Sequence, residues 1–250
     1  MIVDVHAHLG RWPHAVREMT AAEMAAYMAH FGIDYTFVSS STAVYYDFRE
    51  GNREMAEAIR PFPQIKAYVT VNLNYVEESL AEISAYLGPA RTGGPQFAGI
   101  KVHQQTNHQR FNMPAGFAIA GAAAEYGVPI LIHTFSSAIE SPWNVVPVAQ
   151  AYPNVPFILG HMGGEAWWEG ARCAREAANL YLELCSTYTD PPKATSAIAG
   201  AGVERVLFGT DASLFEPTHM LGALEDAGLD DGQRALVMGG NARRLFGLAA

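Results

Sequence analysis

The segment Ile2-Val-Asp-Val-His6-Ala-His8-Leu9 opens the chain as an apolar run that contains two histidines two positions apart. This run is typical of a buried β-strand, in which alternate side chains point to the same face. His6 and His8 therefore face the same way, and two imidazoles can reach one ion. Surface histidines or hydrogen-bonded core histidines are the alternative interpretation of the spacing alone.

An apolar strand followed by a helix recurs eight times along the chain. Strands are predicted at 2–8, 35–39, 66–71, 98–103, 129–133, 155–161, 180–185 and 206–211. Helices are predicted at 20–30, 52–60, 76–87, 115–126, 144–151, 165–178, 192–199, 218–227, 231–238 and 241–248, with a polar loop from Tyr45 to Arg49. Strands that are apolar on both faces favour a parallel sheet, and eight units favour closure into a distorted (β/α)8 TIM barrel, one domain over 1–250. An open doubly wound sheet competes, but the chain has no G-x-G-x-x-G after the first strand and no P-loop.

The composition favours small-molecule chemistry. Half of the 250 residues are hydrophobic, and the net charge is -9, from 16 Lys+Arg against 25 Asp+Glu. This negative net charge does not favour binding to nucleic acid or to an anionic membrane. The two cysteines have no zinc-finger or disulfide spacing, and we expect no leader and no membrane span. These features predict a reduced, cytoplasmic protein with a small-molecule substrate; a homodimer is compatible with the sequence.

Chemistry-bearing side chains recur where the predicted strands end, and in a TIM barrel these ends meet at one mouth. They are His6, His8, His103, His133, His161 and Asp211. Three imidazoles and one carboxylate suit a borderline divalent ion, which we expect to be one zinc, with manganese as the alternative. We assign His6, His8, His133 and Asp211 as ligands, although His133 taken alone reads as a core histidine and Asp211 as a turn cap.

His161 is left without a ligand role at the same mouth. An imidazole is suited to accept or deliver a proton, so His161 is predicted as the acid/base group, with Asp211 sharing the task. The alternative is a structural histidine in the strand.

Lys101 shares a strand face with His103 and is predicted to point into the barrel. A buried lysine needs a partner, and Asp4 and Glu183 are the candidates for this structural polar role. The alternative is a carboxylated Lys101 that bridges two metals.

Four residues are predicted to contact the substrate: Arg11, Trp12, Arg49 and His103. Either arginine could hold a carboxylate, although both could equally be solvated loop residues.

The motifs taken together resemble the amidohydrolase-related branch of the amidohydrolase superfamily, which contains aminocarboxymuconate semialdehyde decarboxylase. They are Asp4-Val-His6-Ala-His8, Gly99-Ile-Lys101-Val-His103, Ile132-His133-Thr, Gly160-His161-Met-Gly-Gly164, Phe208-Gly-Thr-Asp211 and Asn241-Ala-Arg-Arg-Leu-Phe246. The resemblance implies a distorted TIM barrel with one divalent metal on His6, His8, His133 and Asp211, and His161 as acid/base. The branch holds hydrolases and non-oxidative decarboxylases, and this chain is short for the decarboxylases.

Four functions remain. The first hypothesis is a metal-dependent hydrolase that cleaves an ester, lactone or amide bond of a small, carboxylate-bearing molecule with metal-activated water. The second is a metal-dependent decarboxylase of an aromatic or unsaturated acid. The third is a TatD-type nuclease, which the acidic charge and Lys101 argue against. The fourth is a non-enzymatic barrel kept for assembly.

Overall fold

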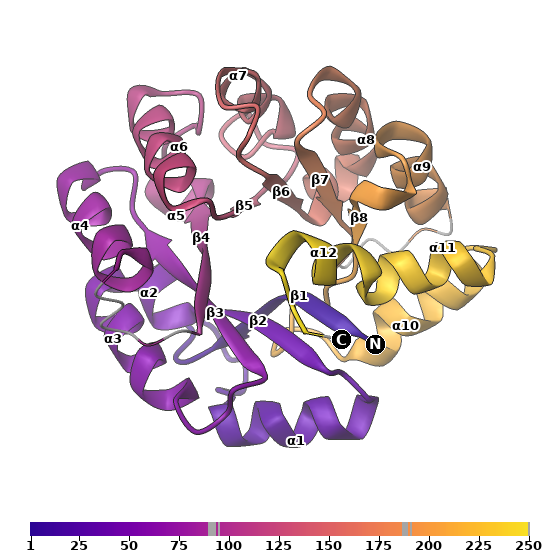
Figure 1. Ribbon diagram of the computed structural model, residues 1–250, viewed down its shortest axis with the longest axis horizontal. Helices are drawn as coiled ribbons and strands as arrows, with labels where there is room; N and C mark the ends of the chain where they lie inside the picture. The colour runs from indigo at the N-terminus through magenta and orange to yellow at the C-terminus, as the bar shows by residue number, and fades with distance from the viewer. Residues whose placement is uncertain (90–93, 95, 187–189, 191, 250) are drawn as a thin grey trace.

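The computed structural model describes residues 1–89, 94, 96–186, 190 and 192–249. Its eight strands form one parallel sheet in the order of the chain, ringed by helices (Figure 1). The strands are β1 (Val3–Leu9), β2 (Tyr35–Ser40), β3 (Ile65–Val71), β4 (Phe97–His103), β5 (Ile130–His133), β6 (Phe157–Gly160), β7 (Leu180–Glu183) and β8 (Val206–Leu207). The predicted TIM barrel is therefore confirmed.

Helices follow the strands on the outside of the barrel. The α-helices are α1 (Ala21–Phe31), α2 (Ser41–Tyr45), α3 (Phe48–Ile59), α4 (Val76–Leu87), α5 (Gln104–Asn107), α6 (Pro114–Tyr126), α7 (Val146–Ala151), α8 (Trp167–Glu176), α9 (Pro192–Ala201), α10 (Pro217–Asp226), α11 (Asp231–Ala235) and α12 (Asn241–Phe246). Short helical turns lie at η1 (Pro142–Asn144), η2 (His161–Ala166), η3 (Val203–Arg205) and η4 (Leu236–Gly240). No helix in the described ranges combines the length and the apolar character that a membrane crossing requires.

Local signals explain several helix ends. Thr20 and Glu23 form a capping box at the start of α1, and Gly32 ends that helix in a left-handed conformation. The predicted loop from Tyr45 to Arg49 is shorter in the structure, where only Tyr46 and Asp47 lie between two helices. The chain forms α2 directly after β2, and α3 already begins at Phe48 because the Asp47 carboxylate accepts from the backbone amides of Arg49 and Glu50.

The barrel closes through irregular backbone between β8 and β1. Val5 N donates to Phe208 O at 3.0 Å, and Thr210 N donates to His6 O at 3.3 Å. The ladder of β8 stops at Leu207, four residues before Asp211, so the predicted strand 206–211 is too long. Asp211 consequently lies on a turn beyond the sheet.

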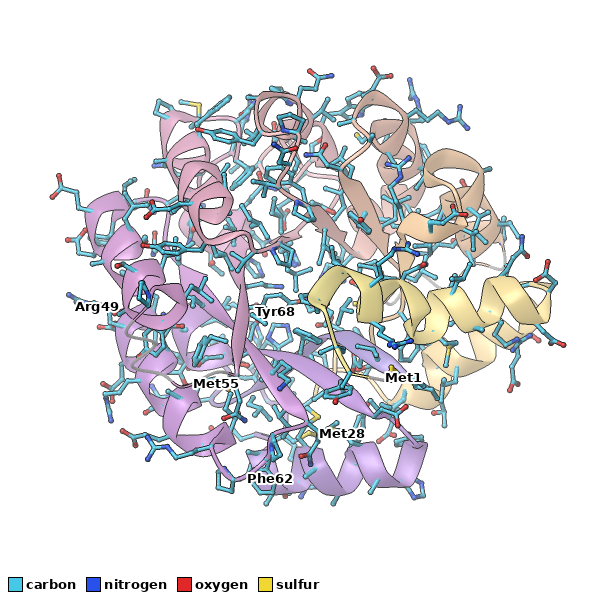
Figure 2. All side chains as sticks on the ribbon, viewed as in Figure 1. Met1, Met28, Arg49, Met55, Phe62 and Tyr68 are labelled. Atoms are coloured by element: carbon cyan, nitrogen blue, oxygen red, sulfur yellow. The ribbon has the colours of Figure 1, made fainter. Side chains whose placement is uncertain are left out.

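An apolar layer fills the barrel at the end opposite the carboxyl ends of the strands. Phe37 and Tyr68 point inward from β2 and β3, and Phe246 at the end of α12 packs on them with a ring distance of 3.9 Å to Phe37. Figure 2 labels Tyr68 near the middle of the molecule. This plug leaves the opposite end of the barrel, at the carboxyl ends of the strands, for chemistry.

A buried carboxylate ties β1 to the segment after β8. Asp4 Oδ1 accepts from His6 N at 3.1 Å and from Thr210 N at 3.0 Å, and Asp4 Oδ2 lies 2.6 Å from Thr210 Oγ1. Burial outweighs these contacts and raises the pKa of Asp4 to about 7.

This raised pKa predicts a pH-dependent stability. Between pH 4 and 7 the folded protein retains a proton on Asp4 that the unfolded chain has lost, so this contribution to stability falls as the pH rises through that range. Asp4→Asn keeps a neutral, isosteric group whose amide can donate to Thr210 Oγ1. Urea unfolding at pH 5 and pH 7.5 should show the wild type losing stability relative to this variant at the higher pH. An equal difference in unfolding free energy between wild type and Asp4→Asn at both pH values would contradict the expectation. Asp226→Asn, which changes an exposed carboxylate, is the control.

Candidate active site

Three of the predicted ligands meet at the mouth of the barrel. His6 and His8 project from β1, and Asp211 reaches them from beyond β8. Asp211 Oδ1 lies 3.2 Å from His8 Nε2 and 3.8 Å from His6 Nε2. All three side chains are buried, and their donor atoms lie within 4.8 Å of one another.

The chemistry of these donors fits a divalent metal. Asp211 Oδ1 is buried yet makes no well-aligned hydrogen bond. Burial raises the pKa of Asp211, but the contacts with His8 and the neighbouring imidazoles outweigh it and hold this pKa well below its ordinary value. Burial lowers the pKa of His6 and of His8. An ionised carboxylate and neutral imidazoles are the forms that bind a cation.

Glu183 fixes the ring of His6. Its Oε2 accepts from His6 Nδ1 at 2.9 Å and from the backbone N of His161 at 3.2 Å. His6 therefore carries its proton on Nδ1 and keeps a lone pair on Nε2, the nitrogen that lies nearer to Asp211 and Lys101. Cys185 Sγ, 2.9 Å from Glu183 Oε2, completes this buried group.

Lys101 is buried beneath the same three residues, as its strand position predicts. Its Nζ lies 2.8 Å from His6 Nε2, and Asp4 bonds to Thr210 instead. Burial lowers the pKa of Lys101 to about 8. A metal ion on His6 Nε2 would take over the lone pair that Lys101 uses here.

His133 and His161 form a second, adjoining pair of imidazoles. His161 Nδ1 donates to the backbone oxygen of Cys185 at 3.1 Å, because a carbonyl can only accept. His161 Nε2 then faces His133 Nδ1 at 3.1 Å. The other nitrogen of His133, Nε2, lies 3.1 Å from Glu140 Oε1. The nitrogens of His133, the fourth predicted ligand, thus face His161 and Glu140.

Unusual backbone aims two of these side chains. Asp211 has φ +56° and His161 has φ +65°, a left-handed region that non-glycine residues rarely occupy. Gly164, at φ +61°, passes so close to Phe135 that a Cβ atom would lie 2.3 Å from that ring. Such conformations cost about 1–3 kcal/mol each and gather at functional sites.

Aromatic rings form the walls around the imidazoles. His133 stacks between His103 and Phe135, with ring centroids 3.9 and 5.2 Å away and planes within 12° and 17° of parallel. Trp12 packs against His8 at 5.0 Å, and its Nε1 donates to Ser213 Oγ. Trp12 and His103 therefore lie beside the imidazoles at the mouth, and their assigned contact with substrate stays a prediction.

The two predicted arginines lie away from these imidazoles. Arg11 is exposed and stacks over the Tyr46 ring at 4.3 Å. Arg49 is exposed, pairs with Asp47 at 3.7 Å and lies at the outer edge of the view in Figure 2. Their assigned contact with substrate stays a prediction.

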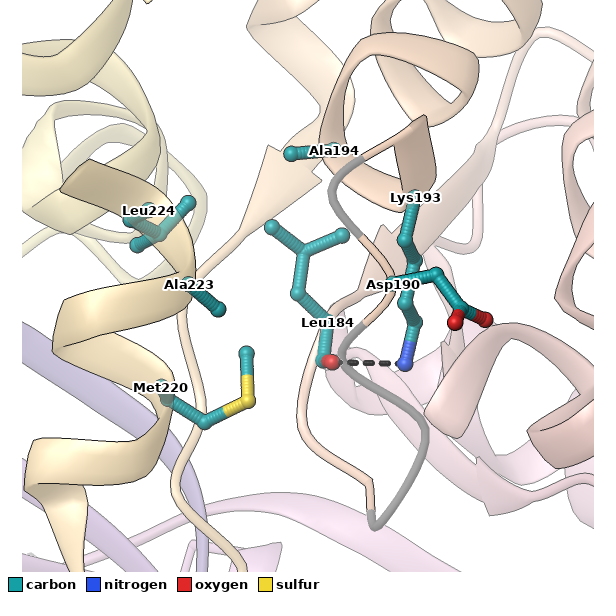
Figure 3. A pocket seen from close by; sticks show the side chains of 7 residues that line it. All are labelled: Leu184, Asp190, Lys193, Ala194, Met220, Ala223 and Leu224. Carbon is teal, nitrogen blue, oxygen red and sulfur yellow. Dashed lines mark hydrogen bonds between the residues drawn. The ribbon is translucent and has the colours of Figure 1, made fainter. Parts of the chain in front are cut away.

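An open cavity of about 330 Å³ borders His133 and gives room for a small molecule. It is lined by Gln105, His133, Phe135, Ser136, Ser137, Glu140 and Glu165. A different cavity, of about 10 Å³, lies between α9 and α10 beside Leu184, whose carbonyl accepts from Lys193 (Figure 3). That volume suits about one water molecule and is too small for a substrate.

Glu140, Phe135 and Cys185 escaped the sequence analysis. Glu140 and Phe135 lie in the loop after β5, which carries no recognisable motif, and only its contacts in space reveal Glu140. Cys185 has the inward parity of Glu183 but no partner cysteine, so nothing in the sequence singled it out.

The sequence profile of the amidohydrolase family matches residues 3–248. No curated protein matches the chain. Among solved structures, 5-carboxyvanillate decarboxylase from Sphingomonas paucimobilis shares 16% identity over 99% of each chain, with a TM-score of 0.79. A dihydroxybenzoic acid decarboxylase from a Polaromonas species, solved with manganese and 2-nitroresorcinol, shares 17% identity over 99% of this chain and 97% of that chain, with a TM-score of 0.80. A putative amidohydrolase from Staphylococcus aureus shares 15% identity over 99% of each, at 0.77. At these identities the likeness establishes the fold.

Proposed function

Because the chain belongs to the amidohydrolase family, we propose that it is a metal-dependent, non-oxidative decarboxylase of a small aromatic or unsaturated carboxylic acid. This corrects the first hypothesis of the sequence analysis, a hydrolase of an ester, lactone or amide. Several solved structures that the fold matches over nearly their whole length are decarboxylases of carboxyvanillate or dihydroxybenzoate. The length of this chain does not argue against a decarboxylase, because the structural match covers 97–99% of those decarboxylases.

The observation that carries the proposal is the pairing of two groups at one mouth. A buried cluster of His6, His8 and Asp211 can hold a cation, and His161 lies beside it with a ring distance of 4.8 Å to His6. Decarboxylation needs a place for the carboxylate and a donor for the proton that replaces carbon dioxide on the carbon. The metal, when bound, would act as a Lewis acid toward the substrate's carboxylate. His6, His8 and Asp211 would hold it, and manganese is the first ion to test because two similar decarboxylases contain it.

His161 is placed to deliver the proton. Its Nδ1 is committed to the Cys185 carbonyl, so only Nε2 can exchange a proton with substrate or with His133. Burial lowers the pKa of His161 to about 4, so a proton placed on Nε2 leaves readily. In our proposal His161 takes up a proton on Nε2 and gives it to the substrate carbon as the bond from that carbon to the carboxylate breaks and carbon dioxide leaves. Water in the open cavity beside His133 then supplies the next proton, through His133, to His161.

The ring walls support a flat substrate. Both faces of His133 are covered, by His103 and by Phe135. Planar surface for a substrate comes from the Trp12 indole beside His8 and from Phe135, which lines the open cavity. Aromatic rings favour offset or edge contacts with such walls, each contributing about 0.5–1.5 kcal/mol beyond area burial.

Manganese-loaded enzyme offered a panel of hydroxylated benzoic acids should release carbon dioxide with an equal amount of ring product. In deuterated water that product should carry one deuterium at the carbon that lost the carboxylate. Removing the metal with a chelator should lower the rate by about 100-fold or more, and manganese should restore it. Hydrolysis of a matched panel of esters and lactones, without carbon dioxide release from the acids, would reject the proposal.

A further inference from the structure

Seven side-chain rings follow one another around the mouth of the barrel and close into a circle, which we call the ring collar. Neighbouring ring centroids lie 3.9–5.9 Å apart along the whole circuit. In order, the ring collar consists of His6, His8, Trp12, Tyr45, His103, His133 and His161. Five of these rings are imidazoles and one is an indole, so Tyr45 supplies the phenol.

Tyr45 enters the ring collar from the end of α2. Its ring lies 5.7 Å from Trp12 and 5.9 Å from His103, and the His14 ring meets it edge-on at 5.6 Å. The side chain is half-buried, and its hydroxyl makes no hydrogen bond with any of the described residues. Three neighbouring rings therefore fix the phenol while its polar end stays without a partner.

The surrounding charges indicate where the Tyr45 hydroxyl points. Burial raises the pKa of Tyr45, and the carboxylates of Asp211 and Glu140 raise it further. Asp211 follows β8 and Glu140 lies in the loop after β5, so both stand across the mouth from α2, which follows β2. The hydroxyl therefore points over the mouth and keeps its proton at neutral pH. A protonated phenol in this place can donate a hydrogen bond to a ligand.

We propose that the Tyr45 hydroxyl donates to the carboxylate of the substrate and anchors the acid within the ring collar. This role rests on the proposed function, because a carboxylate is the acceptor that every substrate of a decarboxylase carries. Trp12 alone separates the Tyr45 ring from the His8 ring, so an acid that reaches the cation ligands also comes within reach of the phenol. The planar walls favour a flat ring, and the Tyr45 hydroxyl favours its charged form.

A binding experiment tests the anchor without turnover. The probe is meta-hydroxybenzoate, whose hydroxyl cannot assist protonation of the carbon that carries the carboxylate. Tyr45→Phe keeps the ring and removes only the hydroxyl. Because a hydrogen bond to a charged group is lost, calorimetry on the manganese-loaded variant should find this acid bound about 10- to 100-fold more weakly than by the wild type.

Two controls isolate the contact with the carboxylate. Phenol, which has the same ring and hydroxyl but no carboxylate, should bind Tyr45→Phe and the wild type alike. Tyr35→Phe removes a hydroxyl from the first residue of β2, at the opposite end of the barrel, and should bind meta-hydroxybenzoate as the wild type does.

Turnover should distinguish anchoring from a part in the chemical step. The carboxylate loses its charge as carbon dioxide forms, so the hydrogen bond from Tyr45 does not strengthen in the transition state. For an acid that the enzyme decarboxylates, Tyr45→Phe should therefore raise KM by about 10- to 100-fold and leave kcat no lower than that of the wild type.

Three results would reject the role of Tyr45 as the anchor. They are a wild type that does not bind meta-hydroxybenzoate, a Tyr45→Phe variant that binds it as well as the wild type, and an equal loss of affinity for phenol. A fall in kcat with unchanged KM would contradict the role too, because Tyr45 would then act on the reacting carbon. If the expected loss of acid binding is found but no acid is decarboxylated, the anchor stands and the proposed function fails.

Discussion

Replacing Asp211 with asparagine is expected to remove both metal binding and turnover. Asp211 is the one carboxylate among the three clustered donors, and its Oδ1 is buried without a well-aligned hydrogen bond. Asparagine keeps the size and the left-handed backbone of this position but loses the negative charge. Without that charge, two neutral imidazoles and the nearby Lys101 would face a divalent cation.

Calorimetry should therefore find manganese affinity reduced by more than about 100-fold, and the rate of carbon dioxide release should fall by at least about 10³-fold. Asp226→Asn, on the exposed face of α10, is the control and should match the wild type. A variant at position 211 that binds manganese normally would show that the ion lies elsewhere, and the proposed centre would have to be abandoned.

The fold was predictable because its signal is repeated. Eight apolar segments alternate with helical ones, and the helix 76–87 was predicted with the bounds that α4 has. The predictions were weakest where strands end. The expected strand to Asp211 stops at Leu207, since the backbone from Phe208 onward bonds to η4 and to β1 instead of continuing the β7 ladder. Periodicity reports the repeating part of a strand, whereas these ends are fixed by contacts with distant segments.

The candidate site was predictable in its residue types and not in its pairings. His6, His8 and Asp211 cluster because barrel closure brings the ends of β1 and β8 together. Which nitrogen of His133 faces which neighbour depends on Glu140, seven residues later in a loop without a motif. The orientation of a ring is set by such outer contacts, which sequence spacing does not encode.

Replacing His161 with asparagine is expected to stop turnover while sparing the metal. Asparagine adopts the left-handed backbone of this position as readily as any non-glycine residue, and its amide can donate to the Cys185 carbonyl as the ring does. It cannot carry a proton to the substrate. Because a positioned acid contributes about 10² to 10⁴ in rate, kcat should fall within that range, with manganese affinity and thermal stability near those of the wild type.

His108 provides a matched control for this substitution. It is also a histidine with left-handed backbone, at φ +50°, but it is exposed at the end of α5. His108→Asn should therefore decarboxylate at the wild-type rate. If His161→Asn kept most of its kcat, the proton would have to come from another group at the mouth, such as Lys101 next to His6. If manganese affinity fell together with kcat, His161 would help to bind the metal. The proposal that the metal ligands and the proton donor are different residues would then be wrong.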